Sequence, residues 1–349
     1  MLRIRMLSGE EVDSIPVGEL SDVKELKLHL HQLHGLPTRF RQRLLRGGNP
    51  MDDSVALDSP MDLDLVLLTY SAASPRQADK LVQYADCGLA AEVEALLQRP
   101  LNPDVATDMG IRPLIAASAA GHVEVVRLLL DAGADVNLAI NDGATALIHA
   151  SLQGLVEVVR LLLDAGADVN LANDDGDTAL MKASLHGQVQ VIRLLLDAGA
   201  DVNLANNDGA TALMKASLHG QVQVIRLLLD AGADVNLAND DGDTALMKAS
   251  LYGQVEVIRL LLDAGADVNL ANDDGDTALM KASRHGQVQV IRLLLDAGAD
   301  MNLSNNDGAT ALIKASDQGH VEVVRLPFDA GSTNKRRRHI EGSTSKRPR

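Results

Sequence analysis

The sequence has very few aromatic residues and a single cysteine. It contains no tryptophan, two phenylalanines and three tyrosines among 349 residues, so burial must rest on Leu, Val, Ile and Ala. Leu and Ala in particular favour helices. The lone Cys87 cannot form an intrachain disulfide, so nothing in the sequence implies an oxidising compartment. Apolar runs of about three to five residues are too short to span a bilayer, and we expect no membrane association.

Charge is distributed unevenly along the chain. The formal net charge is −16, from 48 acidic and 32 basic side chains. Residues 332–349 carry +6, residues 1–74 carry −3, and residues 75–331 carry the remaining −19. An acidic body repels nucleic-acid phosphates, and only the short tail has the charge to attract them. We therefore do not expect nucleic acid as a partner.

A repeat of 33 residues occupies most of the chain. The segment 174–206 returns almost unchanged from residues 207, 240 and 273, and more loosely from residues 108, 141 and 306. One further period back begins at residue 75, where matches to the later copies persist at Leu81 and Gly88. Such a period is typical of copies that stack side by side, because each copy covers the apolar face of its neighbour.

Each copy predicts two short helices. In the copy at 174–206, Thr178 caps a helix from about residue 179 to residue 186, and Gly187 ends it. A second helix begins near residue 189 and places four apolar residues on one face: Val189, Ile192, Leu195 and Leu196. The connector at 170–176 is rich in Asn, Asp and Gly, which predicts an extended, hairpin-like loop between copies.

The period, the D-G-x-T-x-L motif and the L-L-L-x-x-G-A-D-V-N motif together resemble the ankyrin repeat. The family's Thr-Pro-Leu-His is changed here to Thr178-Ala179-Leu180-Met181, and only Pro113 keeps the proline. The resemblance implies an all-α solenoid of seven repeats at 108–331, after a divergent capping repeat at 75–107. Pro327 interrupts the last copy and predicts that its second helix frays or ends there.

Residues 1–70 have no repeat and predict a separate domain. Leu2, Ile4 and Met6 alternate with polar residues, as in a half-buried strand, and residues 12–17 predict the returning strand. Asp22 caps a helix that ends at Gly35. The inward stripe predicted for that helix is Val23, Leu26, Leu30 and Leu33. Residues 43–45 and 63–68 predict further strands.

This order of strands and helix resembles the ubiquitin-like β-grasp, on the motifs Gly35-Leu36-Pro37, Arg43-Leu44-Leu45 and Leu65-Val66-Leu67. The predicted fold class is therefore α+β. A ubiquitin-like β-grasp domain (1–70) and a linker (71–74) precede the all-α ankyrin-repeat solenoid, and a disordered basic tail (332–349) follows it. The chain continues past residue 68 without a diglycine end, so we expect a built-in domain that is not conjugated to other proteins.

The ubiquitin-like resemblance implies an exposed apolar patch at Leu7, Leu45 and Val66, with Arg43 beside it. Ubiquitin receptors grip that surface in the family. If Leu44 is buried, Leu45 points outward by strand alternation. The alternative is that these residues simply pack the fold.

The ankyrin resemblance implies that a concave groove holds a protein client. Groove positions are the residue before the capping Thr and the polar face of the first helix. The predicted groove residues are Asp177, Lys182, Leu185, His186, Lys215, His219, Asp243, Lys248, Tyr252, Asp276, Lys281 and Arg284. The alternative is a solvated face of mixed charge.

The tail contains two basic clusters that fit the pattern of nuclear import signals. Their residues are Lys335, Arg336, Arg337, Arg338, Lys346, Arg347 and Arg349. Importin is therefore an expected partner. The alternative is a solubilising tail that touches its own acidic solenoid.

Searches for catalytic and metal-binding patterns return none. The connector loops lack calcium ligands, because Leu171 and Lys182 occupy the first and twelfth positions of the loop. His186, His219 and His285 recur at one register, about 10 Å apart on stacked helices, too far to share a zinc ion. Phosphate-loop, G-x-S-x-G and H-E-x-x-H motifs do not occur. We expect no enzyme, no cofactor and no metal.

The predicted function is that of a monomeric, non-catalytic adaptor in the nucleus, the cytoplasm or both. Its solenoid binds a client protein, and its ubiquitin-like domain docks ubiquitin receptors or the proteasome. The alternative function is a nuclear scaffold or transcription-cofactor-type ankyrin protein, in which the N-terminal domain is purely structural.

Overall fold

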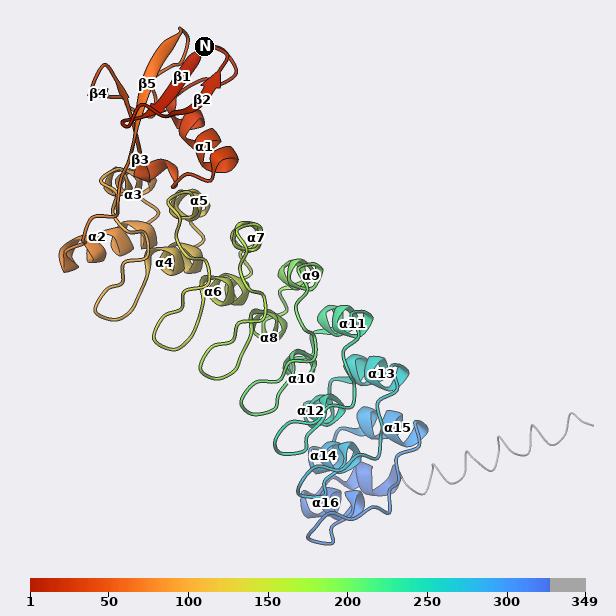
Figure 1. The fold of residues 1–349 in the computed structure, drawn as a ribbon. Helices are drawn as coiled ribbons and strands as arrows, with labels where there is room; N and C mark the ends of the chain where they lie inside the picture. Colours follow the sequence, from red (N-terminus) through yellow and green to blue (C-terminus); the bar gives the residue numbers. More distant parts are fainter. Residues whose placement is uncertain (327–349) are drawn as a thin grey trace, which may run out of the picture. The chain divides into compact units, whose positions relative to one another are not determined.

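The computed structural model describes residues 1–326 of the chain, which form two units (Figure 1). The first unit comprises residues 1–150 and 155–168, and the second comprises residues 151–154 and the chain from 169 onward. Pro327 and the basic clusters predicted as import signals lie outside the described residues. Within residues 1–326, no helix has the length and hydrophobicity to cross a membrane.

The first unit begins with a five-stranded mixed sheet and one helix (Figure 1). Its strands are β1 (Leu2–Met6), β2 (Glu11–Ile15), β3 (Gln42–Arg46), β4 (Asn49–Pro50) and β5 (Met61–Leu67). They lie in the order β2-β1-β5-β3-β4, with β1 and β5 parallel and the other pairs antiparallel. This arrangement is consistent with a β-grasp fold. With the helices that follow, it confirms the predicted α+β class.

Helix α1 (Val23–His34) packs its apolar face against the sheet. The Asp22 carboxylate accepts a hydrogen bond from the Glu25 amide, and Gly35 ends the helix in the left-handed conformation, with φ of 63°. Leu33, predicted to face inward, is 69% exposed. The chain reverses at Gly35, and Leu36 packs against the core in place of Leu33. A 3₁₀ turn, η1 (Arg39–Arg41), leads into β3.

Pairs of short helices follow, as the repeat predicts. The first unit contains α2 (Pro75–Asp86), α3 (Ala90–Leu97), α4 (Pro113–Ala120), α5 (Val123–Asp131) and α7 (Val156–Asp164). Helix α6 (Ala146–Gln153) is divided between the units. The second unit contains α8 (Ala179–Leu185), α9 (Val189–Asp197), α10 (Ala212–Leu218), α11 (Val222–Asp230), α12 (Ala245–Leu251), α13 (Val255–Asp263), α14 (Ala278–Arg284), α15 (Val288–Asp296) and α16 (Ala311–Asp317).

Within the second unit, each helix contacts its equivalents in the neighbouring copies. The capping Thr178 accepts a hydrogen bond from the Met181 amide, as the sequence predicts. In α9 the buried residues are Val191, Ile192 and Leu195, whereas Val189 and Leu196, predicted to be buried, are half-exposed. The buried stripe therefore starts two residues later than the spacing predicts.

Glycine at the end of the first helix is required by its left-handed backbone conformation, at a point where neighbouring copies lie close together. Gly187 has a φ of 71°, which disfavours other residues, and a Cβ there would collide with the Gln221 side chain of the next copy. The neighbouring loops are joined as well. The Asn207 amide donates to the Asp175 carbonyl at 3.0 Å, and the Asn207 side chain donates to the Asp174 carbonyl at 2.7 Å. Packing and hydrogen bonds thus hold each copy in the same register against the next.

In the first unit, a buried arginine joins the sheet domain to the first two helical copies. Arg39 is 1% exposed, and its guanidinium donates to Asp53 at 2.8 Å and to Glu94 of α3 at 2.9 Å. Its Nε lies 3.9 Å from the Asp131 carboxylate at the end of α5. The sheet domain is therefore fixed to α3 and α5 by charge.

Hydrogen bonds to one backbone carbonyl reinforce this junction. Thr38 and Tyr70 both donate to the Ala132 carbonyl, at 3.2 and 2.9 Å. Gln98 donates to Asp53 at 3.0 Å, and Lys27 pairs with the same carboxylate at 2.6 Å. Burial opposes ionisation of Asp53, but the Lys27 and Arg39 charges outweigh it and lower its pKa.

Replacing Arg39 should destabilise the first unit strongly. The Arg39→Ala variant leaves Asp53 with Lys27 alone and Glu94 without its cation, and breaking a buried ion pair costs about 3 to 5 kcal/mol. Denaturant unfolding of the full chain should show this loss in the free energy of unfolding. Hydrogen exchange should quicken in α3 and α5 as well. The exposed Arg46 supplies the control, since Arg46→Ala should change stability by less than about 0.5 kcal/mol. Equal stability of both variants would contradict the role of Arg39.

Candidate protein-binding surfaces

The ends of the first helices form one exposed row in the second unit. His186, His219 and Tyr252 are the residues that follow α8, α10 and α12, and all three are exposed. Tyr252 is the largest of them and is 55% exposed. Arg284, the last residue of α14, is also exposed, and Leu185 is half-exposed. These predicted groove residues thus offer side chains to a partner.

The predicted groove acids are placed differently. Asp177, Asp243 and Asp276 are only 6%, 7% and 6% exposed. Each lies just before a capping Thr, where the loop meets the first helix and the next copy covers it. In this position, a carboxylate offers little surface to a client. The three acids act mainly within the repeat array, a correction to their prediction as groove contacts.

Each buried carboxylate holds lysines from one or two copies. Asp177 pairs with Lys182 of its own copy at 2.7 Å and with Lys215 of the next copy at 3.5 Å. Asp243 pairs likewise with Lys248 at 2.8 Å and with Lys281 at 3.0 Å.

Asp276 completes the series. It pairs with Lys314 of the next copy at 3.1 Å. All five lysines at this position, from Lys182 to Lys314, therefore have a carboxylate partner. Only three of the five copies carry the acid themselves, and these are the copies of Lys182, Lys248 and Lys281.

An asparagine of the next copy completes each carboxylate site. Asn206 donates to Asp177 at 2.9 Å, Asn272 donates to Asp243 at 2.9 Å, and Asn305 donates to Asp276 at 3.0 Å. Burial raises the pKa of an aspartate, but the lysine partners outweigh burial at Asp177 and at Asp243, so both pKa values are lowered. Asp177 and Asp243 are therefore ionised at neutral pH, and they neutralise the lysines that surround them.

The loops between copies carry the uncompensated charge. Exposed carboxylates project from the loop tips at Asp174, Asp175, Asp208, Asp240, Asp241, Asp273 and Asp274. Because the nearby lysines are paired with buried acids, this side of the array presents net negative charge. It favours a partner with basic groups.

In the sheet domain, the predicted patch lies on the face of the sheet opposite α1. Arg43 pairs with Val66 across β3 and β5, and Leu45 follows two residues later on the same face. Arg43 is exposed, Leu45 and Val66 are half-exposed, and Leu44 between them is buried. Leu7, which follows β1, is 69% exposed. The strand alternation expected for Leu44 and Leu45 is therefore present.

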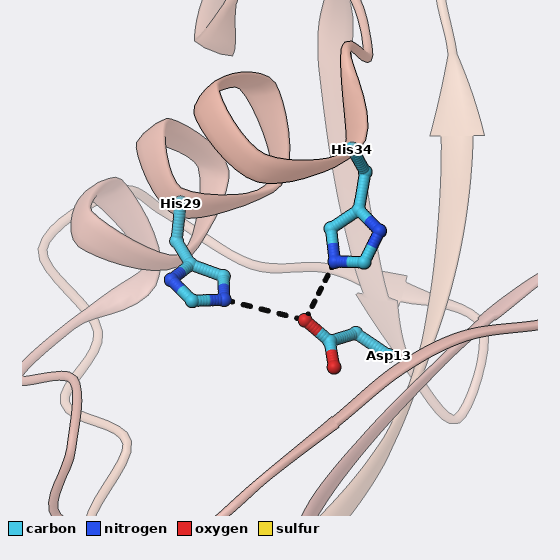
Figure 2. Close-up of side chains that lie close together, drawn as sticks. All are labelled: Asp13, His29 and His34. Atoms are coloured by element: carbon cyan, nitrogen blue, oxygen red, sulfur yellow. Dashed lines mark hydrogen bonds and ion pairs between the residues drawn. The ribbon is translucent and has the colours of Figure 1, made fainter.

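Two groups of interacting side chains were not predicted. The first is Arg39, because nothing in its local sequence marks a buried ion pair. The second group is Asp13, His29 and His34, which come together between β2 and α1 (Figure 2). The signal available was the run of three histidines in six residues, at 29, 31 and 34.

Comparison with known families agrees with the helical geometry. The family described as ankyrin repeats (3 copies) matches residues 81–173, 165–239, 201–272, 231–305 and 264–337. The chain belongs to the ankyrin-repeat family. The family model thereby confirms the resemblance drawn from the period and motifs. Among curated proteins, a search finds no match to the chain.

Membership of the ankyrin-repeat family establishes a protein-protein interaction module. Ankyrin-repeat proteins are generally non-catalytic. Cys87, the single cysteine of this ankyrin-repeat protein, is an exposed free thiol after α2. The exposed row and the acidic loop tips are the candidate surfaces of this module.

Replacing Asp243 should destabilise the array in a pH-dependent way. Asp243→Asn removes the charge that holds Lys248 and Lys281, and charged hydrogen bonds contribute about 2 kcal/mol each. Since the folded pKa of Asp243 lies below its unfolded value near 3.9, its contribution is complete above that value and is lost as pH falls through the folded pKa.

Urea unfolding at pH 7 should therefore separate Asp243→Asn from the wild type, and the difference should shrink below about pH 4. Asp208→Asn removes an exposed loop-tip charge and is the matched control, with little effect expected at either pH. A difference for Asp243→Asn that does not change with pH would exclude the ion pairs as its cause.

Proposed function

We propose that this ankyrin-repeat protein is an adaptor that binds a client through its repeats and docks ubiquitin receptors or the proteasome through its sheet domain. The observation that carries the proposal is an uncovered apolar and basic face at Arg43, Leu45 and Val66. The contacts of Arg39 and Tyr70 with the repeats leave that face accessible. A chain with two free recognition surfaces can bring two proteins together without chemistry of its own.

The client is a protein with a basic segment. Acidic loop tips supply long-range attraction, and the exposed row at His186, His219 and Tyr252 supplies contact area with aromatic character. Aromatic residues at the centre of an interface contribute a large share of binding energy. The near-identity of the copies favours an extended or repetitive client, because successive copies present the same groups at a constant interval.

The docking partner of the sheet domain has an apolar contact surface and acidic groups. Leu7, Leu45 and Val66 provide apolar area, and Arg43 provides charge. These properties match the resemblance to ubiquitin, whose receptors bind an apolar patch. The adaptor acts in the cytoplasm, the nucleus or both.

A nuclear scaffold is the second candidate function. Its support is the pair of basic clusters at 335–338 and 346–349, which fit importin ligands. In this case the repeats bind a transcription or chromatin factor, and the sheet domain serves only to cap the first copies through Arg39. The two candidates differ in whether the Leu45 face binds anything.

Changing Leu45 should abolish docking and leave the fold intact. Leu45→Ser in the full chain should weaken binding to purified proteasome, or to an isolated ubiquitin-associated domain, by at least about tenfold, as for a central apolar contact. Biolayer interferometry measures this affinity. Leu33→Ser, which changes an equally apolar and 69% exposed leucine on α1, is the control and should bind like the wild type.

Circular dichroism melting of both variants separates lost binding from lost folding. A wild-type chain that binds neither probe, or a folded Leu45→Ser chain that binds as tightly as the wild type, would refute docking through this face. Client binding through the repeats would be unaffected by that outcome.

Removal of the basic clusters should prevent nuclear import. A fluorescent fusion that lacks residues 335–349 should be excluded from the nucleus if these clusters bind importin, while the full-length fusion accumulates there. A fusion with all seven predicted basic residues changed to Gln tests charge without changing length. Equal distribution of the truncated and full-length fusions would show that the clusters carry no import signal and would weigh against the scaffold.

A further inference from the structure

Three potential metal ligands converge at the edge of the sheet domain (Figure 2). Asp13 projects from β2, and His29 and His34 project from the second half of α1. Both imidazoles point their Nε2 atoms at the same carboxylate oxygen, Oδ2 of Asp13, at 3.2 Å for His29 and 2.8 Å for His34. One donor atom from each of the three residues lies within 4.8 Å of the others.

The fold orients this group before any ligand binds. Asp13 lies two residues before the buried Ile15 on β2, so both side chains are on the sheet face that α1 covers. The Ser14 amide donates to Oδ1 of Asp13 at 2.7 Å, which leaves Oδ2 facing the imidazoles. His29 and His34 are five positions apart, and the end of α1 brings His34 back toward the carboxylate (Figure 2).

We propose that Asp13, His29 and His34 bind a zinc ion. Tetrahedral zinc takes nitrogen and oxygen ligands at about 2.0 to 2.2 Å, which places donor atoms roughly 3.3 to 3.5 Å apart. The two nitrogen–oxygen separations, 3.2 and 2.8 Å, are slightly shorter than this range, and the two nitrogens lie within 4.8 Å of each other, so side-chain rotations can bring the three donors to an ion. Each Nε2 then presents its lone pair to the metal, with the ring proton on Nδ1, and water fills the fourth position.

The donor set selects the class of metal. Two imidazoles and one carboxylate suit zinc and its neighbours among the divalent transition metals, whereas Ca²⁺ and Mg²⁺ prefer sites made of oxygen. The three side chains are partly buried, with exposed fractions of 22% for Asp13, 26% for His29 and 33% for His34. An ion can therefore enter from solvent, while part of the site stays shielded from it.

Zinc at this position would fasten an edge strand to a helix. Strand β2 is at the end of the sheet order and pairs only with β1 among the described strands. A metal that links Asp13 of β2 to the last turns of α1 would hold this edge against the helix. It would stabilise the sheet domain without touching the Leu45 face.

Metal titration of the full chain tests the site. Isothermal titration with Zn²⁺, and competition against a chromophoric chelator, should show one tight equivalent in the wild type. Co²⁺ in place of Zn²⁺ should give the intense visible absorption of a tetrahedral site. The variants Asp13→Asn, His29→Ala and His34→Ala should each weaken binding at least about tenfold, and the double variant His29→Ala/His34→Ala should abolish the tight equivalent.

His31→Ala is the matched control. His31 lies on the same helix, is exposed, and contacts the Leu36 carbonyl through Nδ1 instead of facing Asp13. This variant should bind zinc like the wild type. Thermal melting in the presence of a chelator shows whether each variant folds. Nitrogen-15 NMR of the imidazoles should show chemical-shift changes at His29 and His34 when zinc is added, with His31 unchanged.

Three results would overturn the proposal. The first is the absence of a tight zinc equivalent in the folded wild-type chain. The second is wild-type affinity in the folded double variant, which would place the ion at another of the ten histidines. The third is tighter binding of Ca²⁺ or Mg²⁺ than of zinc at the same residues.

Discussion

The copies of this ankyrin-repeat protein depend on one another for polar groups as well as apolar ones. Apolar stacking alone would allow a copy to pack against its neighbour in several positions, because the Leu and Ala surfaces are alike in every copy. A buried carboxylate such as Asp177 is more demanding, because it needs Lys182 beside it and Lys215 and Asn206 from the following copy. An unpaired charge in that place would cost several kcal/mol, so only a correctly stacked neighbour is acceptable. These charged contacts thus add to the packing and the loop hydrogen bonds that set the register of the copies.

Buried charge also joins the repeats to the sheet domain at the amino-terminal end, through different residues. Arg39 joins the sheet domain to α3 and α5, which belong to the first two copies, through Glu94 and Asp131. The first copies therefore have an ionic partner outside the repeats. This role is compatible with either function proposed for the Leu45 face.

Local pattern was enough to predict much of the fold. The period, the capping Thr178 and the ending Gly187 predict both helices of a copy, since each signal acts within a few residues. The charged groups were harder, because Asp177 has the same local sequence whether it is exposed or buried, and only the position of the next copy decides this. The partners of Arg39, Asp53 and Glu94, are 14 and 55 positions away from it in the sequence, so no local pattern reveals the pairing. Asp13 and His29 are joined by the sheet-helix packing, which spacing alone does not specify.

The residue before the capping threonine is Asp in some copies and Ala in others, so the loss of one copy does not have the same effect as the loss of another. Their near-identical sequences invite unequal crossing-over, which deletes or adds whole copies. Loss of the copy that begins at residue 207, which carries Ala210, would leave each remaining lysine with an acid in its own or the preceding copy. Loss of the copy that contains Asp177 would set Lys215 between Ala144 and Ala210, with no acid in reach. Selection can therefore shorten this array at some copies and not at others, although their sequences differ at only a few positions.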